Sequence, residues 1–219
     1  MIYIGIPTSG DMRAECVLSL LKASQEMRMA GVKHAIGLVI GLSPISLARA
    51  EMISVFMSCE EATHLLCIDD DMTFSASDIL SLRAAEKPVV GAMCPMKTAK
   101  VSYCVMPSNN PVVDGDCVSV SAVGTGFMMI ERGVIEALIE VTPEIEVMPG
   151  VKRWPLFEAS LVNGEYISED YTFCAKARAL GFGVWAHTAV DIGHVGTHTY
   201  RGRHTASQKV GLLKGGWSE

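Results

Sequence analysis

Three consecutive aspartates, Asp69, Asp70 and Asp71, follow an apolar run in the stretch HLLCIDDDMTF. Because like charges repel one another, three adjacent carboxylates at the end of a buried strand need a positive partner. Carboxylate oxygens suit Mg²⁺ or Mn²⁺, and such an ion also neutralises a diphosphate. In an extended chain Asp69 and Asp71 point to one side and Asp70 to the other. The pattern predicts Asp69 and Asp71 as ligands of a divalent metal, with a solvated acidic turn as the alternative.

A second pair of acids opens a predicted helix in the stretch ISEDYTFCAKARALG. Asp170 shares a helical face with Phe173, Cys174 and Ala177, so its carboxylate is expected to lie along the inward apolar stripe. Glu169 turns away from that stripe. Partial burial raises the pKa of a carboxylate, which suits a general base that accepts a proton from a hydroxyl. Asp170 is therefore a candidate base, and stabilisation of the helix dipole is the alternative for both acids.

Short apolar strands alternate with amphipathic helices along the segments that must position these acids. Strands are expected at residues 2–6, 35–41, 63–69 and 88–94, and helices at residues 15–29, from 44 onward and at 75–86. The first helix carries an apparent inward stripe of Val17, Leu20, Leu21, Ser24 and Met27. This order predicts an α/β fold with a mostly parallel central sheet, and it puts the aspartates at the carboxyl end of a strand, where open α/β sheets bind ligands.

The second half of the chain is less regular. Residues 95–123 read as hairpin turns, residues 118–131 as strand, and residues 132–140 as a short helix. A loop is expected around residues 149–164, followed by the helix that carries Asp170, which Gly181 closes, and by a terminal strand over residues 182–196. We expect a catalytic domain over residues 1–199 and a basic tail over residues 200–219.

Composition limits the classes of protein to consider. The chain has 219 residues, of which 49 % are hydrophobic and 19 % charged, which fits one globular domain. Its net charge of −6 disfavours duplex nucleic acid as a partner. The seven cysteines form no CxxC pair, and no apolar run approaches the roughly 18 residues of a membrane span. A cytoplasmic protein with reduced cysteines is expected.

The order of these motifs resembles that of metal-dependent glycosyltransferases of the GT-A fold, especially small bacterial and viral members. An Asp-x-Asp is followed by a Glu-Asp pair on a helix, and then by His194 in the stretch DIGHVG after the last strand. The resemblance implies a Rossmann-like fold, a nucleotide-diphosphate sugar as donor, with UDP favoured, and Mn²⁺ or Mg²⁺. It implies that His194 completes the metal shell of Asp69 and Asp71, that Asp170 is the base, and that Glu169 orients the acceptor or the base.

The same resemblance implies a set of donor contacts, spread over several loops. They are Pro7, Thr8 and Ser9 after the first strand, Arg49 near the phosphates, Asp70 at the ribose, and Gly124, Thr125 and Gly126 lining the sugar pocket. In the tail, Arg201 and Lys209 are expected to contact the diphosphate as part of a lid. The acceptor, which could be a glycan, a lipid, a protein or a modified base, is left open, as is the oligomeric state.

Two rival functions fit parts of the sequence. The stretch IDDDMT matches the D-x-D-x-T pattern of haloacid-dehalogenase-like phosphohydrolases, in which Asp69 would be the nucleophile, Asp71 the acid/base and Thr73 a phosphate contact. Such enzymes also need a lysine and a second acidic motif, for which Lys97 and the segment 114–116 are the candidates. The other rival is a catalytically silent module that binds sugar nucleotides.

Overall fold

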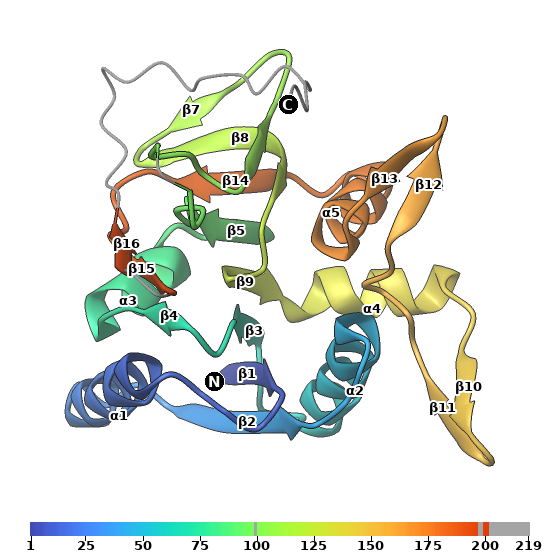
Figure 1. The fold of residues 1–219 in the computed structure, drawn as a ribbon, viewed down its shortest axis with the longest axis horizontal. Helices are drawn as coiled ribbons and strands as arrows, with labels where there is room; N and C mark the ends of the chain where they lie inside the picture. Colours follow the sequence, from blue (N-terminus) through green and yellow to red (C-terminus); the bar gives the residue numbers. More distant parts are fainter. Residues whose placement is uncertain (99, 197–198, 202–219) are drawn as a thin grey trace.

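A nine-stranded sheet forms the centre of the protein in a computed structural model that describes residues 1–98, 100–196 and 199–201 (Figure 1). The strands are β1 (Ile2–Thr8), β2 (His34–Ile40), β3 (His64–Ile68), β5 (Val89–Ala92), β6 (Val105–Pro107), β7 (Val113–Asp114), β8 (Cys117–Val123), β9 (Phe127–Glu131) and β14 (Val184–His187). Their order is β2-β1-β3-β9-β5-β14-β8-β6, and β7 also pairs with β8.

Most strands of this sheet run in one direction. β1 is parallel to β2 and β3, and β14 is parallel to β5. β9 lies antiparallel between β3 and β5, so those two neighbours run the same way. β8 is antiparallel to β14, β6 and β7. Only β8 and β9 therefore oppose the common direction within this sheet, which confirms the predicted α/β class with a mostly parallel sheet.

Helices cover both faces of the sheet. Helices α1 (Ala14–Met29) and α3 (Ala76–Ala84) lie on one face, and α2 (Ile45–Ser58), α4 (Arg132–Val141) and α5 (Glu169–Ala179) on the other (Figure 1). Side chains of β1 alternate between the two cores: Ile2, Ile4 and Ile6 pack with α1, whereas Tyr3 packs with α2. The period-two alternation of a strand thus divides its apolar residues between two hydrophobic layers.

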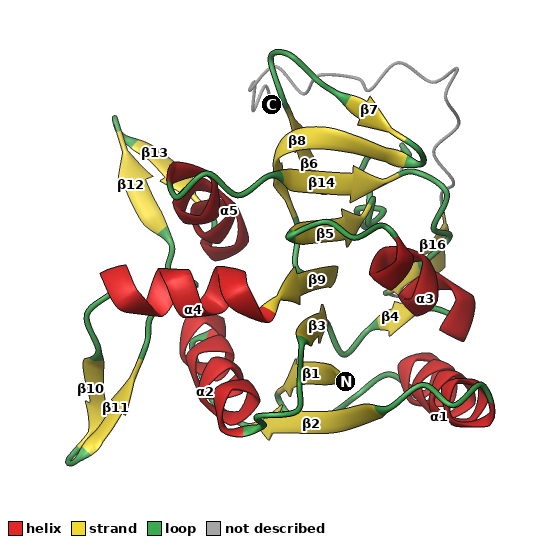
Figure 2. Ribbon diagram, turned by 180° about the vertical axis from the view of Figure 1, so that it is seen from behind, coloured by secondary structure: helices red, strands yellow, loops and turns green. Residues whose placement is uncertain are grey.

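Three smaller strand groups surround the main sheet (Figure 2). β4 (Met72–Thr73), β15 (Gly193–Val195) and β16 (Thr199–Arg201) form a three-stranded sheet. Two hairpins, β10–β11 (Ile145–Met148 and Val151–Arg153) and β12–β13 (Ser160–Val162 and Glu165–Ile167), occupy the region predicted as a loop. The predicted terminal strand is split, because β14 joins the main sheet and β15 joins the small one.

Two further expectations concern the chain as a whole. All seven cysteines are unpaired thiols, as predicted. Among the helices of the described residues, none combines the length and the apolar character that a membrane crossing requires.

Arg132, the first residue of α4, ties this helix to the end of α2. Its Nε donates to the Ala62 carbonyl at 2.6 Å, and its Nη2 donates to the Cys59 carbonyl at 2.6 Å. Its guanidinium carbon also lies 4.7 Å from the ring centroid of Phe56. Carbonyls at and after a helix C-terminus lack partners within the helix, and Arg132 supplies charged donors to two of them; the Cys59 carbonyl also accepts from the Ala62 N–H at 3.0 Å.

We predict that Arg132→Met lowers the free energy of unfolding by about 2–4 kcal/mol, because it removes the charged hydrogen bonds to the Ala62 and Cys59 carbonyls. Arg28→Met is the matched control: Arg28 is exposed near the end of α1, and its loss should cost less than about 0.5 kcal/mol. Urea unfolding of both variants measures this difference. Equal stabilities of the two variants would contradict the anchoring role of Arg132.

Candidate active site

The three aspartates follow β3 directly, at the edge of the sheet where β1 also ends. The backbone N–H of Asp69 donates to the Gly126 carbonyl at 3.2 Å, just before β9. The Arg13 N–H donates to the Asp70 carbonyl at 3.0 Å, from the start of α1. The acidic turn is therefore held by the loop after β1 on one side and by the entry to β9 on the other.

Arg49 of α2 joins the acidic turn to α5. The residue is only 3 % exposed. Its Nη2 lies 3.2 Å from Asp69 Oδ1, and its Nη1 donates to Glu169 Oε1. Its guanidinium carbon is 5.7 Å from the ring centroid of Phe157, which stacks on Phe173 at 4.3 Å. The positive group that compensates Asp69 is thus a buried arginine, shared with the first acid of α5.

The charges of this cluster shift one another's pKa values. Burial acts to lower the pKa of Arg49, but Asp69 and Glu169 outweigh it, so the pKa is raised and the guanidinium stays charged. Burial raises the pKa of Asp69; Arg49 opposes this effect and the nearby charge of Asp71 adds to it. The protonated form of Asp69 is therefore more favoured than that of an ordinary aspartate.

Asp71 has two cationic or basic neighbours. Its Oδ2 pairs with the Lys97 ammonium, and its Oδ1 lies 3.2 Å from His194 Nε2. β15 brings His194 to this place by pairing with β4, and the Val195 N–H donates to the Asp71 carbonyl at 2.8 Å. Burial acts to raise the pKa of Asp71, but His194 and Lys97 outweigh it and lower the pKa to about 2.

The arrangement of Asp71 and His194 fits a divalent cation. His194 Nδ1 lies 3.0 Å from the Pro95 carbonyl, which can only accept, so Nδ1 carries a proton; Nε2 faces Asp71, and in a neutral ring it would do so with its lone pair. Asp71 Oδ1 is buried and accepts no hydrogen bond of good geometry. Two lone-pair atoms at this distance repel unless the ring is protonated or a cation touches both, and a backbone carbonyl behind the histidine is the usual support of a metal ligand.

The predicted third ligand is oriented differently. Asp69 faces Arg49, and within the described part of the chain no three acidic, cysteine or histidine side chains converge closely enough to form a metal site by themselves. The structure therefore brings Asp71 and His194 together. Asp69 lies beside them, and its carboxylate is paired with Arg49.

Asp170 points inward from the first turn of α5 and is 8 % exposed. Its Oδ1 accepts hydrogen bonds from the Ser168 hydroxyl and, at 2.8 Å, from the Tyr171 N–H. A Cβ added at Gly124 would lie 3.4 Å from Asp170 Oδ2 and 2.6 Å from Cys104 Sγ. Burial raises the pKa of Asp170, although the Ser168 hydroxyl opposes this effect. One oxygen is thus held in place, while the other faces a glycine.

The segment 124–126 connects β8 to β9 and lies between the two acidic groups. Gly124 faces Asp170, and a Cβ added at Gly126 would lie 3.6 Å from Asp69 Oδ2 and 3.2 Å from Cys94 Sγ. Thr125 between them is buried. Because glycine has no side chain, the backbone of this segment can approach both carboxylates, and a ligand beside them, more closely than any other residue would allow.

The predicted donor contacts of the first loop surround the same edge. Pro7 and Thr8 end β1 and are buried, whereas Ser9 is exposed. The Thr8 hydroxyl accepts a hydrogen bond from the Gly10 N–H at 3.1 Å. Asp70 is partly exposed at the tip of the acidic turn. These residues remain predicted ligand contacts at the carboxyl end of β1 and β3.

The predicted tail is described only at its beginning. In the pairing of β15 with β16, Arg201 lies opposite Gly193, which directly precedes His194. Its backbone therefore belongs to the small sheet beside the acidic turn. Lys209 lies outside the described residues, as does most of the predicted lid.

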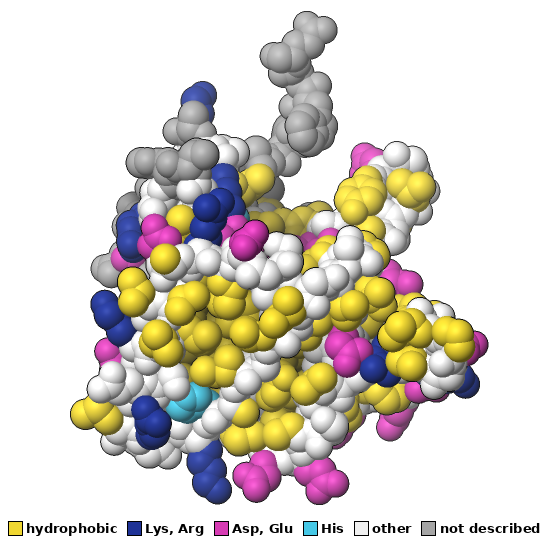
Figure 3. Space-filling model, turned by 60° about the horizontal axis from the view of Figure 1, so that its bottom comes forward, with side chains coloured by type: hydrophobic (Ala, Val, Ile, Leu, Met, Phe, Trp, Pro, Cys, Tyr) yellow, Lys and Arg dark blue, Asp and Glu magenta, His cyan; other side chains and the backbone are white. Residues whose placement is uncertain are grey.

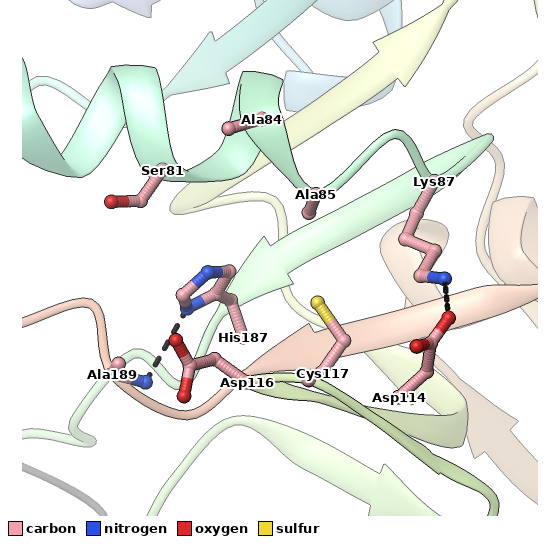
Figure 4. A pocket seen from close by; sticks show the side chains of 10 residues that line it. Ser81, Ala84, Ala85, Lys87, Asp114, Asp116, Cys117, His187 and Ala189 are labelled. Carbon is pink, nitrogen blue, oxygen red and sulfur yellow. Dashed lines mark hydrogen bonds and ion pairs between the residues drawn. The ribbon is translucent and has the colours of Figure 1, made fainter.

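The residues expected of a phosphohydrolase are separated. Lys97 does lie at the acidic turn, but Asp114 pairs with Lys87 instead. Asp114 and Asp116 line a pocket of about 390 Å³ between α3 and β14, together with Cys117 and His187 (Figure 4). None of the three consecutive aspartates lines this pocket, so the proposed second acidic motif has a different place in the fold.

Two positioning contacts were absent from the sequence interpretation. Lys97 was considered only as a phosphate ligand, and the Pro95 carbonyl was not considered at all. Both residues follow β5 closely. Because the carboxyl ends of parallel strands meet at one edge of a sheet, this position in the sequence could have predicted that they lie near the acidic turn. Their partners, Asp71 and His194, lie far away in sequence, and no spacing pattern links them.

The fold is similar to that of solved structures, whereas the sequence matches no protein-family model and no curated protein. The crystal structure of A197 from STIV matches with a TM-score of 0.61 and 16 % identity, over 89 % of this chain and 85 % of that chain. The catalytic domain of Drosophila beta1,4galactosyltransferase 7, in complex with xylobiose, matches with a TM-score of 0.50 and 12 % identity, over 86 % of this chain and 66 % of that chain. These likenesses confirm the predicted GT-A type of α/β fold.

Proposed function

We propose that the protein is a metal-dependent glycosyltransferase that moves a sugar from a nucleotide-diphosphate donor, with UDP as the expected nucleotide, to an acceptor hydroxyl. One observation carries the proposal. The acidic turn after β3 and the Glu169–Asp170 pair of α5 are joined through Arg49, and both border the glycine segment 124–126. Carboxylates that would hold a metal and a carboxylate that would accept a proton thus share one edge of a GT-A type fold.

Asp71 and His194 would hold Mn²⁺ or Mg²⁺, with Asp69 beside them and paired with Arg49. When bound, such an ion acts as a Lewis acid that stabilises the charge of the departing nucleotide diphosphate. The Lys97 ammonium lies against Asp71 and adds positive charge at the same place. Arg201, beside His194 in the small sheet, is the described part of the tail that could reach the phosphates.

Asp170 would accept the proton of the acceptor hydroxyl. The Ser168 hydroxyl and the Tyr171 N–H fix its Oδ1, which leaves Oδ2 toward Gly124 as the basic atom. Burial raises its pKa and so makes it a stronger base than an exposed aspartate. Arg49 is a positioning residue in this scheme, because it fixes Glu169 next to the base and Asp69 next to the metal ligands.

A phosphohydrolase with Asp69 as its nucleophile has weaker support. Asp69 is paired with Arg49, and the acids at 114 and 116 line the pocket on the α3 face. Trapping of an acyl-phosphate on Asp69 would favour that alternative. Binding of UDP and metal without any turnover would favour the silent binding module.

We expect Asp71→Asn to weaken Mn²⁺ binding at least about tenfold, because one ligand loses its charge, and to abolish hydrolysis of UDP-sugars. Calorimetric titration with Mn²⁺ measures the first effect, and release of UDP measures the second. Asp116→Asn, the same change at an exposed acid outside the site, should leave both unchanged. Full turnover by the wild-type protein in excess EDTA would contradict the proposed metal dependence.

Asp170→Asn keeps the shape of the side chain but removes the base. Transfer to the acceptor should fall by about 10²–10⁴-fold, while UDP binding in the presence of Mn²⁺ stays within about twofold of wild type. Asp116→Asn again serves as the control. Transfer at the wild-type rate by the Asp170→Asn protein would exclude this residue as the base.

The pH dependence of transfer should report the raised pKa of Asp170. The base works only when deprotonated, so the rate should fall as the pH decreases through that pKa, at a pH above the ordinary value of about 3.9 for aspartate. Rates measured at saturating donor over a pH series provide the profile. In Asp170→Asn the residual rate should lack this acid limb; an unchanged limb would assign it to another group.

A further inference from the structure

β2 forms one edge of the main sheet, and among the described strands it pairs only with β1. The Ile2 N–H donates to the Lys33 carbonyl at 3.1 Å, and the Gly41 N–H donates to the Thr8 carbonyl at 2.9 Å. In a parallel ladder, alternate residues bond to the same neighbour, so the odd-numbered residues of β2 face β1. The even-numbered residues, from His34 to Ile40, direct their N–H and C=O groups toward the open edge.

The side chains of these even-numbered residues lie on the α1 face of the sheet. His34 Nε2 is hydrogen-bonded to the Ser24 hydroxyl of α1 at 2.8 Å, which fixes the direction of its face. By the period of two, Ile36, Leu38 and Ile40 point the same way. They are 41 %, 45 % and 62 % exposed, so no described element covers them.

α1 extends this surface with three more apolar side chains. Val17 and Leu21 share a helical face with Ser24, toward β2, and Leu18 adjoins them. They are 36 %, 62 % and 55 % exposed, whereas Leu20 and Met27 are buried in the core. We call Val17, Leu18, Leu21, Ile36, Leu38 and Ile40 the β2–α1 apolar face. Figure 3 shows hydrophobic side chains gathered over the side of the molecule where these elements lie.

The area of this face suits a protein interface. An aliphatic side chain presents on the order of 100 Å², so six that are about half exposed offer roughly 300 Å² of apolar surface per copy. Interfaces are about 57 % apolar, so two such faces correspond to roughly 1,000 Å² of total buried surface, the lower limit for a specific interface. A second copy therefore supplies enough area.

The two edges of the sheet differ in their protection against pairing. β2 has seven residues, HAIGLVI, without proline, lysine or an acid. At the other edge, β6 has three residues, ends at Pro107 and contains a register shift, and β7 has only two residues. Short strands, proline and bulges are the usual means of blocking an edge. β2 lacks all of them, as expected of a strand whose open edge pairs with another strand in the assembled protein.

We propose that two copies of the chain associate through β2, antiparallel about a two-fold axis at Leu38. Ile36 of one copy then lies opposite Ile40 of the other, the outward N–H and C=O groups of both strands pair, and no like charges meet, because the strand carries no acid, lysine or arginine. The axis is perpendicular to the sheet, so both α1 helices lie on one face of a continuous sheet and flank the joined apolar faces. A symmetric partner fits because the same surface complements itself.

Light scattering during size-exclusion chromatography of the full chain tests the proposal over a hundredfold range of concentration. The expected mass is twice the 23.5 kDa of one chain. Leu38→Lys should raise the dissociation constant at least about a hundredfold and give single chains, since an edge lysine blocks strand pairing. Leu161→Lys, at a leucine of β12 that is 76 % exposed, should leave the dimer intact.

Circular dichroism identifies a variant that fails to fold; in that event Ile40→Lys, at a more exposed position of the same strand, replaces Leu38→Lys. A wild-type mass of one chain at every concentration would overturn the proposal. So would unchanged dimers of the β2 variants, or assemblies of more than two chains whose mass grows with concentration. Donor hydrolysis is not needed for any of these measurements, so the outcome is independent of the proposed glycosyltransferase activity.

Discussion

The buried guanidinium of Arg49 is the contact on which the rest of the site depends. Asp69 comes from the end of β3 and Glu169 from the start of α5, and without a cation between them these carboxylates would repel each other at a partly desolvated place. Removing one partner of such a buried group typically costs about 3–5 kcal/mol. The packing of Phe157 against Phe173 places an aromatic face beside the arginine. The acidic turn and α5 can therefore share one edge of the sheet.

The positive charge at the acidic turn is divided between two places with different properties. Arg49 is buried and pairs with both Asp69 and Glu169, which suits a residue that stabilises the fold. Lys97 is a flexible side chain that is 36 % exposed, and it contacts the same carboxylate that faces His194. A cation that binds Asp71 would compete with the Lys97 ammonium and would not disturb Arg49. The two halves of the cluster can thus serve stability and ligand binding separately.

Local patterns were enough to predict β1, β2, β3, β5, helices α1 to α5 and the inward direction of Asp170, because each depends on hydrophobic periodicity or on spacing within one turn. Residues 118–131, expected as strand, instead form β8 and β9 with the segment 124–126 between them. The two hairpins were missed because their strands have only three or four residues, several of them exposed, and show no clear alternation. In α1 the expected stripe was partly wrong: Leu20 and Met27 are buried, but Val17 and Leu21 are exposed. The contacts of Arg49 and Lys97 depend on strand order, which one sequence does not show.

The most direct test of the account is anomalous diffraction at the manganese absorption edge, from crystals grown with Mn²⁺ and UDP. The account predicts a peak in contact with both Asp71 and His194, near the end of β3, with the diphosphate beside it. Arg49 should still bridge Asp69 and Glu169 in the same crystals. A manganese peak elsewhere, or UDP bound at another edge of the sheet with no metal at Asp71, would contradict the proposed site.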